Sequence, residues 1–248
     1  MSGVSTLLQR TMNARRYGFL FLRNRWFRLP QKIKIGSTWV SWAYPDEHGV
    51  MIDFLTCIVH DEYGLDSVPA KPGTILDIGA NIGLFALAAR GRYPQATIHC
   101  YEPNPRALSY LQANATAANF TVHHEAVGDG DGFVQIVDTS DSNQATTIDV
   151  NGAAIPGVGI PKVSFDKAIE RLGSVDLLKM DCEGAEWEIF RARQAWRKVR
   201  ELRMEYHLKD NHTVADVKHA MAELDFSITR LTEGPNFGTL WATNRDIA

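Results

Sequence analysis

The chain has 248 residues, of which 45% are hydrophobic, 22% charged and 10% aromatic. This composition is typical of a globular protein and excludes a disordered, collagen-like or coiled-coil chain. The length suits one large domain or two small ones, and the formal net charge of −3 excludes a chain that is polybasic throughout.

The charges are distributed unevenly along the chain. The first 45 residues contain no acidic residue and eight basic ones. The residues after 45 hold 18 of the 26 basic residues and all 29 acidic residues, a net charge of −11. We therefore expect a basic, aromatic-rich N-terminal extension (residues 1–59) that acts as a lid or dimer element, followed by an acidic domain over residues 60–248.

The signals for export and for disulfide bonds are weak. Cys57, Cys100 and Cys182 form no CxxC pair and are odd in number, which favours a reducing compartment over a disulfide framework or a zinc ribbon. No run of apolar residues is long enough for a membrane-spanning helix. Residues 15–20 are similar to a twin-arginine signal, but the apolar run ends at Arg23, and the Arg-rich, acid-free start also has features of an organellar transit peptide. We expect a cytoplasmic protein.

The predicted elements become regular after Gly73. Before it, residues 5–28 predict one or two short helices and residues 31–59 a small mixed region. The expected strands are 74–78, 96–101, 120–126, 133–137, 145–150, 175–180, 199–206, 226–231 and 239–243. The expected helices are 82–92, 105–118, 165–172, 185–195 and 214–224, with Asn104 as the N-cap and Pro105 as the first residue of the second of them.

The alternation of strands and helices predicts an α/β fold with a Rossmann-like, doubly wound and mainly parallel sheet. The last two strands are separated only by a short loop at 233–236. They must pair antiparallel, because a parallel crossover needs a longer connection.

The first chemical motif is Asp77-Ile78-Gly79-Ala80-Asn81-Ile82-Gly83, between the first buried strand and a helix. Glycines there permit a tight turn and close approach of a ligand, and Asn81 tolerates a left-handed conformation and can cap the helix. Glu102 ends the next strand, where a carboxylate can accept both hydroxyl hydrogens of a ribose. An acid at Asp77 disfavours a pyrophosphate and favours a ligand with an ammonium and a sulfonium group. Asp77 therefore favours S-adenosylmethionine over NAD as the ligand.

Three further segments follow later strands of the predicted sheet. The loop 125–129 is expected beside the adenine. Residues 178–186 carry three acids at the end of the fourth sheet strand, of which Asp181 is best placed to face the ligand crevice at the switch point. His207 ends the fifth strand and is a candidate general base, because its ordinary pKa lies near neutrality. Carboxylates at Asp181, Glu183 and Glu205 could bind a hard cation, but their spacing does not predict a metal site, and none is expected.

These segments together resemble an FkbM-type methyltransferase, a branch of the class I S-adenosylmethionine-dependent superfamily. The resemblance covers about residues 60–240 and rests on five stretches, ILDIGANIGLFALAA (75–89), YEPNP (101–105), EAVGD (125–129), LLKMDCEGAEWEIF (177–190) and FLTCIVHDEYG (54–64). It implies a seven-stranded sheet whose last strand is antiparallel. Residues 1–50 match no pattern, so the resemblance does not identify the acceptor.

The resemblance also implies roles for individual residues. Together with Asp77, the cofactor is expected to contact Glu62, Tyr63, Gly79, Ala80, Asn81, Gly83, Glu102, Pro103, Asn104, Ala126, Val127 and Asp181. Within this set, Glu102 would hold the ribose, Ala126 and Val127 would flank the adenine, and Asp181 would lie under the methyl-transfer position.

The expected reaction is O-methylation of a hydroxyl on a small molecule, such as a sugar or another natural product. Asp181 or Glu183 is expected to take the proton, with His207 as the rival base. N-methylation, attack within the cofactor itself, and NAD-dependent oxidoreduction are the enzymatic alternatives. A nucleic-acid or membrane-binding module built on the basic extension is the non-enzymatic one. We expect a small-molecule acceptor and no nucleic acid as partner, with a homodimer left open.

Overall fold

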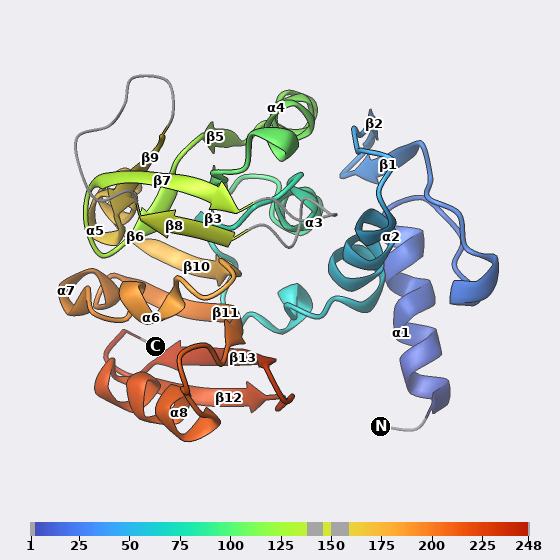
Figure 1. Cartoon of the computed structure of the whole chain (residues 1–248). Helices are drawn as coiled ribbons and strands as arrows, with labels where there is room; N and C mark the ends of the chain where they lie inside the picture. Colours follow the sequence, from blue (N-terminus) through green and yellow to red (C-terminus); the bar gives the residue numbers. More distant parts are fainter. Residues whose placement is uncertain (1–2, 138–145, 150–158, 248) are drawn as a thin grey trace.

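The computed structural model describes residues 3–137, 146–149 and 159–247. Its centre is a seven-stranded sheet of order β12-β13-β11-β10-β3-β4-β5 (Figure 1). The strands of this sheet are β3 (Thr74–Ile78), β4 (Thr97–Tyr101), β5 (Thr121–His123), β10 (Val175–Met180), β11 (Val199–His207), β12 (Phe226–Leu231) and β13 (Phe237–Asn244). β13 runs antiparallel to both of its neighbours, whereas all the other pairs in the sheet are parallel. The predicted fold class and the reversed last strand are confirmed.

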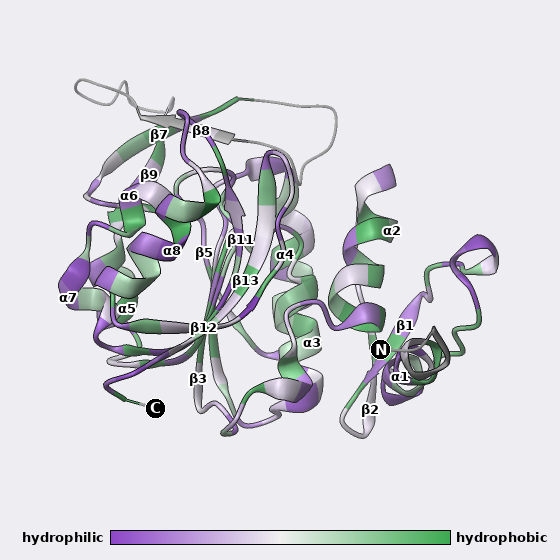
Figure 2. Ribbon diagram, turned by 90° about the horizontal axis from the view of Figure 1, so that it is seen from below, coloured by the Kyte–Doolittle hydropathy of each residue, from purple (hydrophilic) through white to green (hydrophobic). Residues whose placement is uncertain are grey.

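Helices cover both faces of the sheet, as Figure 2 shows. On one face lie α3 (Leu84–Arg92) and α4 (Pro105–Ala118); on the other lie α5 (Phe165–Glu170), α6 (Glu186–Ile189), α7 (Arg193–Trp196) and α8 (Val214–Glu223). Each face buries its own apolar cluster, since Leu87 and Ile98 belong to one and Leu178 and Trp196 to the other. The sheet is therefore doubly wound, as the alternating pattern predicted.

Two predicted elements are divided in the structure. The expected helix over 185–195 is two short helices, α6 and α7. The expected strand over 120–126 ends at His123, and the chain then crosses to a second sheet of order β6-β9-β7-β8. The strands of this second sheet are β6 (Ala126–Gly128), β7 (Gly132–Val137), β8 (Thr146–Asp149) and β9 (Ile160–Ser164).

The predicted hairpin is the antiparallel pair β7–β8, and the ends of its second strand at 145 and 150 lie outside the described residues. β9 escaped prediction because Pro161 is typical of a strand's edge or end, and pairing with β6 and β7 is what orders it.

The N-terminal extension packs onto the face of the sheet that α3 and α4 cover. Its elements are α1 (Gly3–Arg16), η1 (Asn24–Trp26), β1 (Lys32–Ile35), β2 (Thr38–Ser41), α2 (His48–Phe54) and the π-helical turn η2 (Leu55–His60), and η3 (Leu65–Ser67) follows. Phe21 and Phe54 share one apolar cluster with Leu87. The buried side chain of Asn114 in α4 accepts a hydrogen bond from the backbone N–H of Ala43 and donates to the carbonyl of Ala43. The boundary at 59/60 stays a prediction, and the apolar core is continuous across it.

A buried ion pair joins the two central strands of the seven-stranded sheet. Asp77 in β3 and Lys179 in β10 are register partners, and Lys179 Nζ lies 3.3 Å from Asp77 Oδ1. The two residues are 0% and 4% exposed. Burial alone would lower the pKa of Lys179, but the charges of Asp77 and Asp181 raise it above its ordinary value, so Lys179 stays protonated. Burial raises the pKa of Asp77, and the charge of Lys179 opposes that shift.

Removal of the lysine is expected to destabilise the fold. Lys179→Met should lower the free energy of unfolding by about 3–5 kcal/mol, because the Asp77 carboxylate then stays buried without a counter-charge. In this variant the pKa of Asp77 is higher in the folded state than in the unfolded state. The variant is therefore most stable at low pH and loses stability as the pH rises through the folded-state pKa. Guanidinium unfolding at a series of pH values measures both effects.

The double variant Asp77→Asn, Lys179→Met separates the charge from the packing. It should recover at least half of the lost stability, because no unpaired charge remains in the core. The matched control Lys198→Met changes an exposed lysine and should alter the free energy of unfolding by less than about 0.5 kcal/mol. A single variant as stable as the double variant would contradict the charge argument.

Candidate active site

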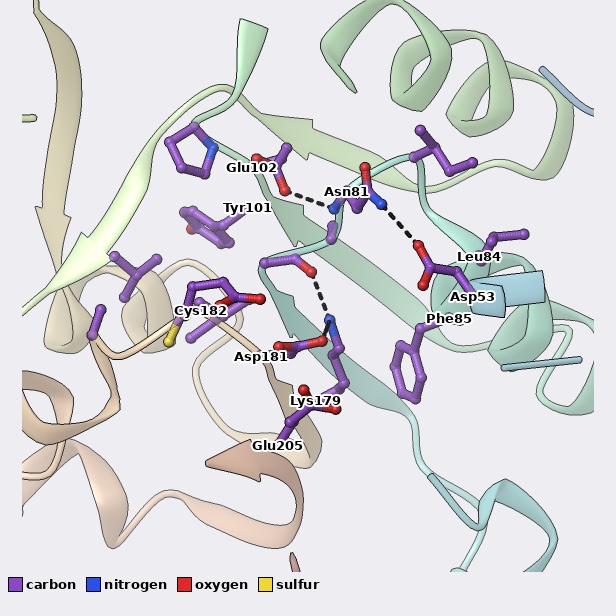
Figure 3. Close-up of a pocket in the computed structure, with 18 of the residues that line it drawn as sticks. Asp53, Asn81, Leu84, Phe85, Tyr101, Glu102, Lys179, Asp181, Cys182 and Glu205 are labelled. Carbon is purple, nitrogen blue, oxygen red and sulfur yellow. Dashed lines mark hydrogen bonds and ion pairs between the residues drawn. The ribbon is translucent and has the colours of Figure 1, made fainter. Parts of the chain in front are cut away.

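A cavity of about 570 Å³ lies at the carboxyl ends of β3, β4, β10 and β11. Ligands bind at this edge of doubly wound sheets, where the connections diverge to opposite faces. The β3–α3 loop forms one wall, the turn after β10 another, and α2 with η2 a third. Thr147 of β8 also lines the cavity, so the second sheet contributes to its rim. Figure 3 shows side chains from these separate elements converging on the same space.

Gly79 brings the first wall and the end of β10 into contact. Its φ is +73°, and a Cβ at this position would lie 1.7 Å from the carbonyl oxygen of Asp181. The backbone N–H of Asp181 donates to the carbonyl of Ile78 at 3.0 Å. No L side chain fits here, because the space is filled by the backbone of the neighbouring strand. The motif predicted a glycine for close approach of a ligand. The structure shows that Gly79 is needed because the backbone of Asp181 lies against it.

Asn81 forms the centre of a hydrogen-bond chain on the other side of the loop. Its φ of +48° is left-handed, as predicted. Its backbone N–H donates to Glu102 Oε2 at 2.7 Å, and its side chain donates to Asp53 Oδ2 at 3.2 Å (Figure 3). The prediction that Asn81 caps the helix is wrong, because Gly83 is the N-cap residue of α3 and the Asn81 side chain is bound to Asp53 instead. These hydrogen bonds connect the β3–α3 loop to α2.

Glu102 is held by the backbone at the tip of β4. Its second oxygen, Oε1, accepts a 2.7 Å hydrogen bond from the backbone N–H of Asn104. Burial raises the pKa of Glu102 to about 7, although the hydrogen bonds from Asn104 and Asn81 partly oppose the shift. Each oxygen of the carboxylate retains accepting capacity beyond its one backbone partner. Glu102 is therefore a fixed acceptor of hydrogen bonds in the wall of the cavity.

Asp181 follows β10 and lies between a phenol and an ammonium group. Tyr63 Oη donates to Asp181 Oδ2 at 3.2 Å, and Lys179 Nζ lies 3.9 Å from the same oxygen. Burial, together with the charge of Asp181, raises the pKa of Tyr63 well above its ordinary value, so its hydroxyl remains a donor. Lys179 Nζ also donates to the carbonyl of Gly79 at 2.6 Å. These contacts fix the position of Asp181 in the cavity.

His207 lies at the end of β11 among three carboxylates. Its Nδ1 is 3.1 Å from Glu186 Oε1, and its Nε2 is 3.4 Å from Glu183 Oε2 and 3.7 Å from Glu205 Oε1. Burial alone would lower the pKa of His207, but the hydrogen bond and charge of Glu186, with the charge of Glu183, raise it. Burial and the charge of Asp181 raise the pKa of Glu205 as well. A proton is therefore retained in this cluster at neutral pH.

The same cluster contains a candidate set of metal ligands. Asp181, Glu205 and His207 each offer one atom, and these atoms lie within 4.8 Å of one another. Oxygen and imidazole ligands suit several divalent cations. The Tyr63 hydroxyl and the Lys179 ammonium already lie at Oδ2 of Asp181.

Most of the residues predicted from the sequence meet at this cavity. Those that line it are Glu62, Tyr63, Gly79, Ala80, Asn81, Glu102, Pro103, Ala126, Val127, Asp181, Glu183 and His207. Asp77, Gly83 and Asn104 are not among the lining residues. Asp77 is fully buried against Lys179, Gly83 caps α3, and Asn104 caps α4 by accepting from the N–H of Arg106. These three hold the walls in place.

Sequence reasoning gave no role in the site to Asp53, Cys57, Lys179 and Phe237, and considered Glu205 only as a cation ligand; all five line the cavity. Lys179 carried a detectable signal, since a lysine inside the apolar strand VDLLKM needs a buried counter-charge. The sequence around Asp53 gave no signal of a role in the site, because α2 reaches the cavity only through tertiary packing.

Known proteins resemble this chain in sequence and in fold. The family model described as the methyltransferase FkbM domain matches residues 77–228. A protein named Methyltransferase 1 from Beauveria bassiana (strain ARSEF 2860) is 30% identical over 188 residues, which cover 66% of this chain and 75% of the relative. The 31-O-demethyl-FK506 methyltransferase FkbM of Streptomyces tacrolimicus is 40% identical over 62 residues, which cover 25% of this chain and 22% of that protein.

A solved structure shows the same fold. The crystal structure of a methyltransferase FkbM from Methylobacillus flagellatus KT superposes with a TM-score of 0.50 at 20% sequence identity. The match covers 69% of this chain and 44% of that chain, so this chain spans less than half of its length. With the family model matching more than half of its residues, the chain belongs to the FkbM methyltransferase family of S-adenosylmethionine-dependent enzymes.

Proposed function

We propose that the protein transfers a methyl group from S-adenosylmethionine to a hydroxyl of a small molecule. The observation that carries this proposal is the placement of Glu102 and Asp181 on two walls of one cavity, at the tips of β4 and β10. A carboxylate suited to a ribose diol and a second carboxylate suited to a sulfonium or ammonium group thus face the same ligand space.

The donor set of the cavity fits S-adenosylmethionine. Glu102 would hold the ribose, the apolar residues Ala126 and Val127 would contact the adenine, and Asp181 with Tyr63 would lie toward the methionine end. The cavity volume of about 570 Å³ lies in the range of small-molecule sites. When bound, the cofactor supplies a methyl group already activated by its sulfonium. The protein must then hold the acceptor oxygen in line with that methyl, exclude water and remove a proton.

We place proton removal in the pair formed by Glu205 and His207. Asp181 is occupied by Tyr63 and by the charge of Lys179, so it acts best as a fixed negative charge near the sulfonium. The raised pKa values of Glu205 and His207 make this pair a strong base in its deprotonated form. Glu186 accepts from the Nδ1–H of His207 and so turns Nε2 toward Glu183 and Glu205. In this proposal Glu183 tunes the charge of His207 in place of acting as the base.

Ribose recognition predicts a specific effect of Glu102 on cofactor binding. Glu102→Gln should weaken S-adenosylmethionine binding roughly 10–100-fold, because hydrogen bonds to an ionised acceptor are replaced by weaker neutral ones. In the unmodified protein the affinity should rise with pH through about 7 and then level off, since the carboxylate of Glu102 forms in that range. The variant should lack this pH dependence. Isothermal titration calorimetry measures both effects, with Glu170→Gln, an exposed acid, as the matched control. Equal affinities of Glu102→Gln and the control would refute the ribose assignment.

The acceptor chemistry is tested by labelling. The protein is incubated with S-adenosylmethionine carrying an isotope-labelled methyl group and with a panel of hydroxylated sugars, polyketides and amines. We expect labelled methyl ethers and one S-adenosylhomocysteine per transfer, measured by mass spectrometry and by the chemical shift of the labelled carbon. Labelled N-methyl products would show that the protein catalyses N-methylation and would contradict the proposed O-methylation. Cofactor cleavage without a methylated product would indicate attack within the cofactor.

The proposed base pair predicts a non-additive pattern in methyl transfer. With an acceptor found by labelling, Glu205→Gln and His207→Gln should each lower kcat about 10²–10⁴-fold, the range for loss of general base catalysis. The double variant should be little slower than either single variant, because the two residues act as a unit. Asp181→Asn should instead weaken binding of S-adenosylmethionine. A normal kcat in Glu205→Gln would contradict the role of Glu205 in proton removal and would leave Asp181, Glu183 or His207 as the base.

A further inference from the structure

The N-terminal extension carries an apolar and basic surface that the cavity does not use. Before residue 40 of this region, seven large apolar side chains are between 47% and 74% exposed, namely Leu7, Leu8, Met12, Leu20, Leu22, Trp26 and Trp39. They make up most of the strongly exposed large apolar residues in the described parts of the chain. Within those parts, no residue before Ile52 lines the cavity. The exposed apolar side chains of this surface therefore take no part in the wall of the cavity.

Contacts between its segments join these side chains into one surface. Leu8, Met12 and Arg15 follow helical spacing on the outer face of α1, opposite the buried Ala14 and Tyr17. The loop after α1 returns along the helix, where Thr11 Oγ1 lies within hydrogen-bond distance of the carbonyl of Phe21. The ring of Trp39 covers Gly18, since a Cβ there would lie 2.3 Å from that ring. Figures 1 and 2 place α1 on the side of the molecule opposite α7.

The charged residues of the loop after α1 have one sign. Arg23, Arg25 and Arg28 are exposed in the loop that carries Leu20, Leu22 and Trp26, and within the described residues none of the three forms an ion pair. Arg23 lies 5.9 Å from the centre of the Trp26 ring. The chain has no acid before Asp46. The loop thus presents exposed apolar side chains with unpaired cations between them in the sequence.

We propose that this surface binds the anionic face of a lipid membrane. Exposed leucine, methionine and tryptophan beside arginine is the composition of segments that lie in the membrane interface, where apolar side chains enter the acyl boundary and cations meet the headgroups. The net charge of −11 on the rest of the chain orients the basic end toward such a membrane. Methyl transfer then takes place beside a membrane surface.

Two other occupants fit the surface less well. In a symmetric dimer the patch would face itself, and the three arginines of each copy would approach those of the other. A nucleic acid would use the arginines and stack on the tryptophans, but leucine and methionine side chains offer nothing to phosphates or to base edges. The lipid surface is the occupant that uses both the charge and the aliphatic side chains.

Among the described residues, no helix combines the length and the apolar character needed to cross a membrane. Binding of the proposed surface to a membrane is measured with intact vesicles and the full chain. Co-sedimentation uses vesicles of equal parts phosphatidylcholine and phosphatidylglycerol, with pure phosphatidylcholine vesicles as the neutral comparison. We expect binding to the anionic vesicles that weakens as salt is added.

Two variants test the two components of the surface. The triple variant Arg23→Gln, Arg25→Gln, Arg28→Gln should bind anionic vesicles roughly 100-fold more weakly, because each cation near an anionic leaflet contributes roughly fivefold. The triple variant Leu20→Ser, Leu22→Ser, Trp26→Ser should lose binding even at low salt. The matched control Arg193→Gln, Arg197→Gln, Lys198→Gln removes three exposed cations at α7 and should bind as the unmodified chain does.

Sedimentation velocity of the same proteins without vesicles completes the test. Vesicle binding that depends on both triplets and is unaffected in the α7 control supports the proposal. An unmodified chain that does not bind anionic vesicles overturns it. So does a dimer that dissociates in the Leu20, Leu22, Trp26 variant, or equal vesicle binding by the α7 control and the Arg23, Arg25, Arg28 variant. The cofactor affinity tested through Glu102 is measured separately, so failure here leaves the proposed methyl transfer standing.

Discussion

The buried ion pair between Asp77 and Lys179 is the constraint on which the site depends. It joins β3 and β10 at the switch point of the sheet, and both loops that form the cavity's inner walls begin two or fewer residues beyond it. The same ammonium holds the carbonyl of Gly79 and lies beside Asp181. In a low-dielectric core, removal of either partner leaves an uncompensated buried charge, which destabilises the fold. One lysine therefore connects the stability of the sheet with the electrostatics of the cavity.

The electrostatics of the site follow from this arrangement. The motifs place acids near the ends of β3 and β10, namely Asp77 and the three acids of residues 178–186, of which Glu186 is the last. The structure divides these acids by burial. Asp77 neutralises Lys179 and Glu186 binds His207, whereas Asp181, Glu183 and Glu205 line the cavity. Fewer acids therefore line the cavity than lie near these strand ends, because Asp77 and Glu186 are paired with Lys179 and His207.

The N-terminal extension has two different relations to the rest of the protein. Its last part, α2 and η2, reaches the cavity, where Asp53 binds the side chain of Asn81. Its first part, α1 and the loop after it, packs one face against the common core and leaves the other exposed. A charge asymmetry that runs along the sequence thus becomes a spatial one, with a basic, apolar end and a cavity lined by carboxylates. The proposed membrane surface and the proposed methyl-transfer site occupy separate parts of the molecule.

The sequence by itself determined most of the order of strands and helices after Gly73, the antiparallel last strand and twelve of the residues that line the cavity. It could do so because glycine turns, caps and acids at strand ends are local signals, and parallel strands bring their carboxyl ends to one edge. Only the tertiary structure decided that Gly79 is required by the carbonyl of Asp181, that Asp77 is withdrawn from the cavity, and that Asp53 lines the cavity. Those outcomes depend on which segments meet, and the distances between segments far apart in the chain leave no local trace. The split of residues 120–126 between two sheets has the same origin, since its second part is ordered by pairing with β9.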